Sequence, residues 1–216
     1  MLSGHNISYN RVMLYIVIFL FLAFDSFSQD EIEFKKMITR RINKPLSEFP
    51  DKLHSLKTVI FDLNRDGETD KIQLIKKNGL DYIRILDEKD NNVFEKELQT
   101  KGVESKIYKA RFVTLSNKVN CLVLYFYEGN RQTHLFEGAA RVYFLTIENK
   151  DLKKMYLFQG GHYFHEKLEF KDKYFLKEFT VNIKDLNKDG IKEVSLKYNK
   201  MSRTYMYLGK GSWNKL

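Results

Sequence analysis

The segment FDLNRDGETDKIQLI (residues 61–75) places a short acidic loop between two apolar runs. Oxygen-bearing side chains stand at alternate positions of this loop, at Asp62, Asn64, Asp66, Glu68 and Asp70. Gly67 holds position 6, where a residue without a Cβ permits a sharp reversal of the chain. Alternate residues of such a loop direct oxygen atoms inward, and hard oxygen ligands suit calcium. The segment therefore predicts a calcium loop whose side-chain ligands are Asp62, Asn64, Asp66 and Asp70, with Glu68 offering its backbone carbonyl.

The same spacing recurs in IKDLNKDGIKEVSLKY (residues 183–198). The predicted side-chain ligands of this second loop are Asp185, Asn187, Asp189 and Glu193. Ile191 stands where a backbone carbonyl is needed, and Gly190 stands where the first loop has Gly67. We therefore expect two calcium sites, both with a structural role.

Neither loop is an ordinary EF-hand, because both are flanked by strand-like sequence and lack the bidentate glutamate at position 12. That position holds Gln73 in the first loop and Leu196 in the second, so the ninth position must close the site. Loop one (residues 62–70) carries a net charge of −3 and loop two (residues 185–193) a net charge of −1. We therefore expect tighter binding in loop one, within the range of about 10⁻⁴ to 10⁻³ M typical of extracellular modules.

Residues 1–28 have the pattern of an export signal. Arg11 precedes an apolar run of 13 residues, and Ser26 and Ser28 provide the small residues of a cleavage site before Gln29. The run is shorter than the ~20 residues of a membrane-spanning helix. We expect a cleaved signal and an exported protein, whether periplasmic, at the cell surface or secreted; an uncleaved signal anchor is the alternative.

Composition fits a folded and basic domain. The chain has 216 residues, 43% of them hydrophobic, and a formal net charge of +9 that removal of residues 1–28 leaves unchanged. The single cysteine, Cys121, excludes an intrachain disulfide, and its apolar neighbours predict a buried and inert thiol. Calcium bound in the two loops would therefore have to provide the stabilisation that disulfides provide in many exported domains.

Residues 29–45 predict one short amphipathic helix. The apolar residues of this segment share one helical stripe, Asp30 and Glu33 form a capping pair, and Pro45 ends the segment. We expect the helix to dock against the rest of the domain, with a membrane-surface role as the alternative because the segment also carries Lys35, Lys36, Arg40 and Arg41.

From residue 57 onward, short β-forming runs alternate with polar turns. The runs are TVIF, KIQLI, DYIRIL, RFVTL, CLVLYFY, ARVYFLTI, KKMYLF, YFLKEFTVNI, KEVSLKY and RTYMYL. The 13 tyrosines, 17 phenylalanines and only two prolines favour half-buried strands. Residues 57–216 therefore predict a single all-β domain.

With its two loops, the chain resembles the FG-GAP or VCBS repeat of integrin-like β-propellers. That repeat consists of a strand, a D-x-D-x-D-G-x-x-D loop, two further strands and a turn ending in an aromatic residue. Residues 59–94 and 181–213 follow it throughout. The resemblance implies calcium as a structural ion in both loops, bound by the ligands named above. It covers about a third of the chain.

Two further segments, residues 111–127 and 140–170, resemble units that have lost their metal ligands. Propellers carry about 4 to 8 blades of four strands each. We therefore expect a small or incomplete β-propeller-like array of antiparallel blades. An open blade-like sheet or a β-sandwich is the alternative, and closure through a second copy is a further option.

Signs of catalysis are few. His162 and His165 form the one histidine cluster, and residues three apart in a strand face opposite sides. Phosphate loops, nucleophile elbows and zincin motifs are absent from the sequence, and Gly160 with Gly161 predicts a turn. A catalytic site remains open as an alternative, because active-site residues can come from distant parts of a chain.

Three hypotheses follow from these observations. The first is an exported, calcium-binding, non-catalytic domain that binds a protein or a glycan, including an acidic cell-envelope polymer. The second is a secreted or periplasmic hydrolase with structural calcium and an active site that includes His134, His162 and His165. The third is an interaction protein held at a membrane by an uncleaved signal. Export argues against nucleic acid as the physiological ligand despite the basic charge.

Overall fold

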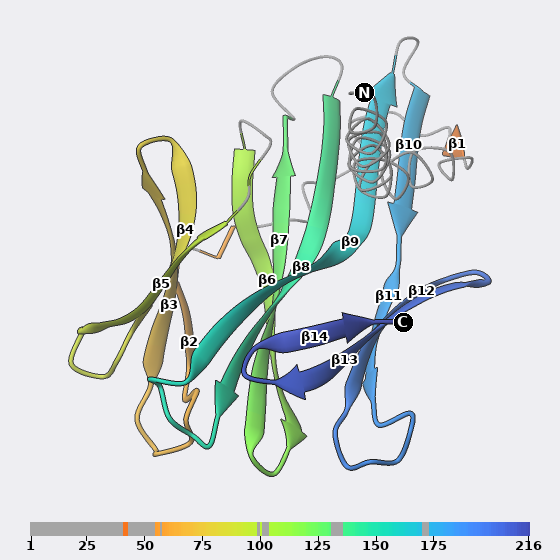
Figure 1. Ribbon diagram of the computed structural model, residues 1–216. Helices are drawn as coiled ribbons and strands as arrows, with labels where there is room; N and C mark the ends of the chain where they lie inside the picture. The colour runs from red at the N-terminus through yellow and green to blue at the C-terminus, as the bar shows by residue number, and fades with distance from the viewer. Residues whose placement is uncertain are drawn as a thin grey trace, which may run out of the picture. The chain divides into compact units, whose positions relative to one another are not determined.

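The computed structural model describes residues 41–42, 55–56, 58–98, 100, 104–130, 136–169 and 173–216. Within these ranges every regular element is a β-strand, which confirms the predicted all-β class. The strands form three antiparallel sheets, one of six strands and two of four (Figure 1).

The six-stranded sheet, sheet A, curls into a half-barrel. Its strand order is β1 (Arg41–Ile42), β10 (Lys173–Glu178), β9 (Met155–Glu169), β8 (Phe136–Glu148), β7 (Val119–Gly129) and β6 (Glu104–Ser116). Consecutive strands β6 to β10 are neighbours, so this part of the chain runs back and forth as a meander.

The two smaller sheets are meanders of the same topology. Sheet B consists of β2 (Thr58–Phe61), β3 (Asp70–Lys77), β4 (Leu80–Leu86) and β5 (Asn92–Leu98) in chain order. Sheet C consists of β11 (Thr180–Lys184), β12 (Glu193–Tyr198), β13 (Met201–Gly209) and β14 (Ser212–Lys215), also in chain order. The tight turn between β3 and β4 uses Asn78 and Gly79, whose φ angles of 51° and 79° are those that a two-residue hairpin needs.

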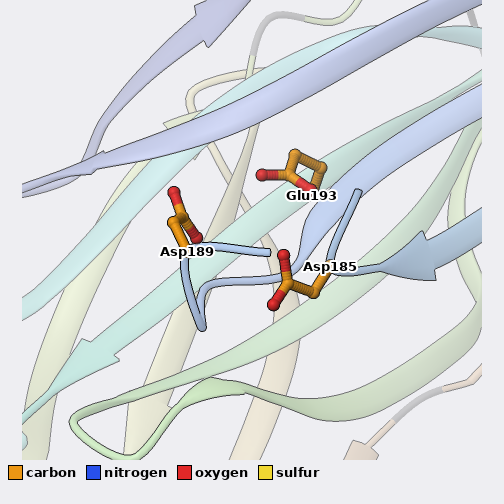
Figure 2. A group of neighbouring side chains, drawn as sticks. All are labelled: Asp185, Asp189 and Glu193. Atoms are coloured by element: carbon orange, nitrogen blue, oxygen red, sulfur yellow. The ribbon is translucent and has the colours of Figure 1, made fainter. Parts of the chain in front are cut away.

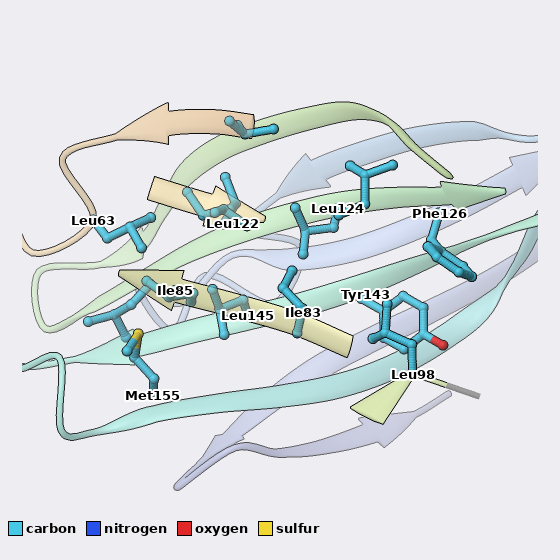
Figure 3. Packing of buried hydrophobic residues seen from close by; sticks show 14 residues of the cluster. Leu63, Ile83, Ile85, Leu98, Leu122, Leu124, Phe126, Tyr143, Leu145 and Met155 are labelled. Carbon is cyan, nitrogen blue, oxygen red and sulfur yellow. The ribbon is translucent and has the colours of Figure 1, made fainter. Parts of the chain in front are cut away.

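One face of sheet A packs against sheet B. Alternate residues of β7, among them Leu122 and Leu124, share a buried cluster with alternate residues of β4, Ile83 and Ile85 (Figure 3). Such alternation is what a strand with one face in a core requires. Phe126, Tyr143, Leu145, Leu63 and Met155 belong to the same cluster.

The other face of sheet A packs against sheet C through aromatic rings. The ring centroid of Phe144 on β8 lies 4.6 Å from that of Trp213 and 5.4 Å from that of Tyr205. Phe144 pairs in register with Val123 of β7. All 11 residues of β7 are buried. Leu122 and Leu124 face sheet B, and on the opposite face Tyr125 and Tyr127 contact Tyr163 and Phe164 of β9 inside the curl of sheet A.

Sheet A differs from the expectation of two separate metal-free blades in residues 111–127 and 140–170. These segments belong to one continuous sheet, since β7 and β8 pair along their whole length from Val119–Glu148 to Gly129–Gly138. The sequence shows strands in these segments but not which strands pair.

Gly160 and Gly161 lie inside β9, so the predicted turn is wrong. A Cβ atom at Gly160 would come within 2.8 Å of Val142, and one at Gly161 within 2.5 Å of the hydroxyl of Tyr205. Both glycines are therefore explained by close packing.

The predicted helix over residues 29–45 lies outside the described residues except for Arg41 and Ile42. These two form strand β1, which pairs with β10, so the helix prediction is wrong at these positions. The predicted signal segment, residues 1–28, also lies outside the described ranges. The parts of the chain that the structure describes include no helix that could cross a membrane.

Candidate metal-binding loops

Loop one joins β2 to β3 and loop two joins β11 to β12. Each loop is therefore the first connection of a four-stranded meander, and each ends at the first residue of the second strand, Asp70 or Glu193. The predicted ligands thus occupy equivalent places in two sheets of the same topology.

The first carboxylate organises the reversal of each loop. Asp62 accepts a hydrogen bond from the backbone N–H of Gly67 at 3.1 Å, and Asp185 accepts the equivalent bond from Gly190 at 3.0 Å. Both glycines have positive φ angles, 97° and 85°, in the region that only glycine adopts easily. The prediction that position 6 needs glycine for the turn is confirmed.

The asparagine at position 3 pairs with the aspartate at position 5 in both loops. The Nδ2 atom of Asn64 donates to Asp66 at 2.6 Å, and that of Asn187 donates to Asp189 at 2.8 Å. The other oxygen of each aspartate accepts the backbone N–H at position 7, that of Glu68 at 2.9 Å and that of Ile191 at 2.7 Å. These bonds set the position of the side chains before any ion binds.

The ninth position closes each loop with a buried carboxylate. Asp70, 3% exposed, accepts a hydrogen bond from the backbone N–H of Leu63 at 2.9 Å. Glu193, also 3% exposed, accepts one from Leu186 at 2.7 Å. The two loops therefore share their turn glycine and four equivalent hydrogen bonds.

Loop two brings three carboxylates together. One oxygen each from Asp185, Asp189 and Glu193 lie within 4.8 Å of one another, and Figure 2 shows the three side chains around a common space. The Oε1 atom of Glu193 is buried and has no hydrogen-bond partner. A buried carboxylate oxygen without a partner is costly, so a cation in this space would supply the missing interaction.

Loop one is less compact. Among the described residues, no three carboxylates of loop one bring oxygen atoms within 4.8 Å of one another, as those of loop two do. Burial raises the pKa of Asp70, and the negative charges of Asp66 and Asp62 raise it further. Hydrogen bonds from the Glu68 N–H and from Asn64 lower the pKa of Asp66. The repulsion felt by Asp70 is of the kind that a divalent cation relieves.

Both loops are tied to the β6–β7 hairpin of sheet A. Asn120 donates to the backbone carbonyl of Leu63 at 3.2 Å, and Arg65 donates to the Thr114 hydroxyl at 2.5 Å. The backbone N–H of Lys192 in loop two donates to the carbonyl of Leu115 at 3.0 Å. Local sequence patterns do not reveal these anchors, because each joins residues far apart in the chain.

The described histidines each have a local partner. The Nε2 atom of His162 lies 2.8 Å from Arg141, and that of His165 lies 3.1 Å from Glu137. Burial lowers the pKa of His165. No group of metal-binding side chains among the described residues includes either histidine, and His134 lies outside those residues.

Comparison with known proteins gave no relative from which to assign a function. No protein-family model matches the chain, and no significant match was found among curated proteins or among solved structures.

Proposed function

We propose that the protein is an exported, calcium-stabilised, non-catalytic interaction domain of the FG-GAP or VCBS type. The observation that carries the proposal is the Glu193 carboxylate, whose Oε1 atom is buried without a hydrogen-bond partner and which lies together with the carboxylates of Asp185 and Asp189. An oxygen-lined space of this kind matches the preference of calcium for hard oxygen ligands.

The repeated architecture supports calcium in both loops. Sheets B and C have the same strand order, and each carries its acidic loop in the first connection. The two loops also have equivalent internal hydrogen bonds, but only loop two brings three carboxylates, those of Asp185, Asp189 and Glu193, close to one another. We propose that loop one closes around the ion through Asp62, Asn64, Asp66 and Asp70, with the carbonyl of Glu68.

A structural role for the ions follows from where the loops are attached. Each loop joins two strands of a small sheet and contacts the same hairpin of sheet A, through Asn120 or Leu115. Calcium would therefore hold sheets B and C to sheet A. At ten times its dissociation constant, each ion would stabilise the fold by about 1.4 kcal/mol.

The proposed role as an interaction domain rests on two supports. The first is the resemblance to a repeat that occurs in binding proteins. The second is that His162 and His165, the candidates for catalysis, are engaged by Arg141 and Glu137. Export is proposed from residues 1–28 alone, and the partner is proposed to be a protein or a glycan.

A calorimetric calcium titration tests the proposal. The wild-type protein is compared with the single variants Asp66→Ala and Asp189→Ala and with the double variant. We expect two equivalents of calcium in the wild type, one in each single variant and none in the double variant. The control, Glu104→Gln, removes a carboxylate of β6 outside both loops and should leave both equivalents.

Thermal unfolding in calcium and in chelator completes the test. The wild type should melt at a higher temperature in calcium, and the double variant should melt at the same temperature in both. Absence of binding heat, or the same melting shift in the double variant as in the wild type, would refute calcium stabilisation through these loops.

A further inference from the structure

We propose that a groove between sheet A and the β10–β11 connection binds an acidic saccharide, meaning hydroxylated sugar rings that carry carboxylates. The inference deepens the proposed function and rests on it, because it names the ligand class of the interaction domain. The groove has a volume of about 340 Å³, at the small end of the range of about 300–1,000 Å³ for ligand sites.

Two buried tyrosines line the groove. Tyr125 on β7 and Tyr163 on β9 are 3% and 4% exposed, and their rings meet edge to face with centroids 5.1 Å apart. Because β8 lies between these strands, the rings approach each other across a concave part of sheet A. Tyr108 of β6 joins them at 6.3 Å from Tyr125. The groove therefore has a rigid aromatic base.

Charged side chains stand around this base. Lys109 and Arg111 come from β6, at one edge of sheet A, and Glu178 comes from the end of β10. The β10 side is fixed by a 2.6 Å hydrogen bond from the N–H of Phe179 to the carbonyl of Tyr163. Phe179, Thr180 and Val181 complete the lining.

The two cations are available to a ligand. Lys109 places its Nζ atom 4.9 Å from the centroid of the Tyr125 ring. Within the described part of the chain, neither Lys109 nor Arg111 forms an ion pair or a side-chain hydrogen bond, and Glu178 forms none either. A ligand carboxylate can therefore pair with the cations without breaking an existing ion pair.

The tyrosine hydroxyls keep their protons. Burial raises the pKa of Tyr125 and of Tyr163, and the negative charge of Glu178 raises the latter further. The lining thus combines cationic and hydroxyl donors with a single carboxylate acceptor.

This combination favours an acidic saccharide over a phosphate polymer. A uronic acid offers one carboxylate for Lys109 and Arg111 and several hydroxyl groups that can donate to Glu178. A nucleic acid carries a negative charge on every unit and has few hydroxyl donors, so Glu178 would repel it. Removing the negative charge of Glu178 should therefore affect the binding of the two ligand classes in opposite directions.

The test measures binding of a tetrasaccharide of alternating glucuronic acid and N-acetylglucosamine, by calorimetry in calcium and in chelator. We expect the wild type to bind it and to ignore the same tetrasaccharide with its carboxylates reduced to alcohols. The double variant Lys109→Ala, Arg111→Ala should weaken binding about tenfold or more. A control with the same loss of charge, Lys96→Ala with Lys200→Ala, removes exposed lysines outside the groove and should bind as the wild type does.

Glu178→Gln separates the ligand classes. We expect it to weaken tetrasaccharide binding, since the amide is a poorer acceptor for hydroxyl groups. Tightened binding of a thymidine oligonucleotide by Glu178→Gln, without tetrasaccharide binding, would overturn the proposal in favour of nucleic acid. Equal binding of the reduced and acidic tetrasaccharides, or equal losses in the groove and control variants, would also overturn it.

Calcium titration of the same samples keeps the two proposals apart. Calcium binding without tetrasaccharide binding would refute the groove and leave the calcium loops standing. Tetrasaccharide binding without calcium heat would support the groove and refute the loops.

Discussion

Replacing Glu193 by glutamine should have opposite effects on stability in chelator and in excess calcium. In the metal-free loop, the Oε1 atom of Glu193 is buried without a hydrogen-bond partner, and one oxygen of the Glu193 carboxylate lies within 4.8 Å of oxygens of Asp185 and Asp189. Such an oxygen costs about 1–3 kcal/mol, and more when it is charged. Glutamine keeps an oxygen for the N–H of Leu186 and places an NH₂ donor near Asp185 and Asp189. We therefore expect Glu193→Gln in chelator to raise the free energy of unfolding by about 1–3 kcal/mol.

Calcium should reduce or reverse this advantage. At ten and one hundred times the dissociation constant of loop two, the wild type gains about 1.4 and 2.7 kcal/mol at this site. The variant lacks the closing carboxylate and should gain little there. The stability difference between the two proteins should shift by the same amounts in favour of the wild type.

Urea unfolding in chelator and at a series of calcium concentrations measures the difference, with the fluorescence of the single tryptophan, Trp213, as the signal. Trp213 is suitable because it is largely buried against Phe144. Glu104→Gln serves as the control, and its difference in stability from the wild type should stay the same at every calcium concentration. A Glu193→Gln variant that is less stable than the wild type in chelator, and that responds equally to calcium, would contradict our account of loop two.

Three further predictions concern the rest of the fold. Burial lowers the pKa of His165 below the ordinary value of 6.5. The stability that the neutral side chain contributes is therefore complete above pH 6.5 and is lost as the pH falls through the lowered pKa. Urea unfolding from pH 7.5 to pH 5 should show less acid destabilisation in His165→Gln than in the wild type. Burial raises the pKa of the fully buried Cys121 thiol, so thiol reagents should label it only after denaturation, and rapid labelling of the native protein would refute this. Gly138→Ala would place a Cβ 2.1 Å from the hydroxyl of Tyr127, which donates to the buried Glu166. This overpacking should lower the free energy of unfolding by about 1–3 kcal/mol. An unchanged denaturation midpoint would contradict the prediction.

The strands could be predicted where the pattern is local. Alternating apolar residues indicated β3 and β4, and continuous apolar runs indicated β7 and β8. β5 was not among the predicted runs, because its sequence NVFEKEL is mostly polar and is held partly by charge pairs such as Arg84 with Glu95. β14 was also missed, since a segment of four residues with one aromatic gives little periodicity.

The arrangement of the sheets could not be predicted in the same way. The resemblance to a repeat implied four similar units, and two of them correspond to sheets B and C. The long strands between these sheets join into sheet A instead: β7 pairs with β8, for example at Tyr127 and Ala140, and both lie inside a sheet of six strands. Nothing in the local pattern distinguishes pairing within a blade from pairing across one long sheet.

The candidate ligands were chosen from spacing alone; the structure brings Asp185, Asp189 and Glu193 together, and metal binding by these residues stays a prediction. The expectation of tighter binding in loop one came from charge and stays a prediction. The groove had no sequence signal, since Lys109 and Glu178 come from strands at opposite sides of sheet A and only the curl of the sheet brings them to one groove.

The late position of Trp213 in the chain has a consequence for the order of events during synthesis. Sheet B is made before β7, but Trp213, which covers the Phe144 side of sheet A, is made after every strand of that sheet. The nascent chain therefore presents the Phe144 side of β8 uncovered until β14 has emerged. A chaperone that holds the chain during this interval would recognise this strand first, and a chain cut before Trp213 would expose it permanently to aggregation.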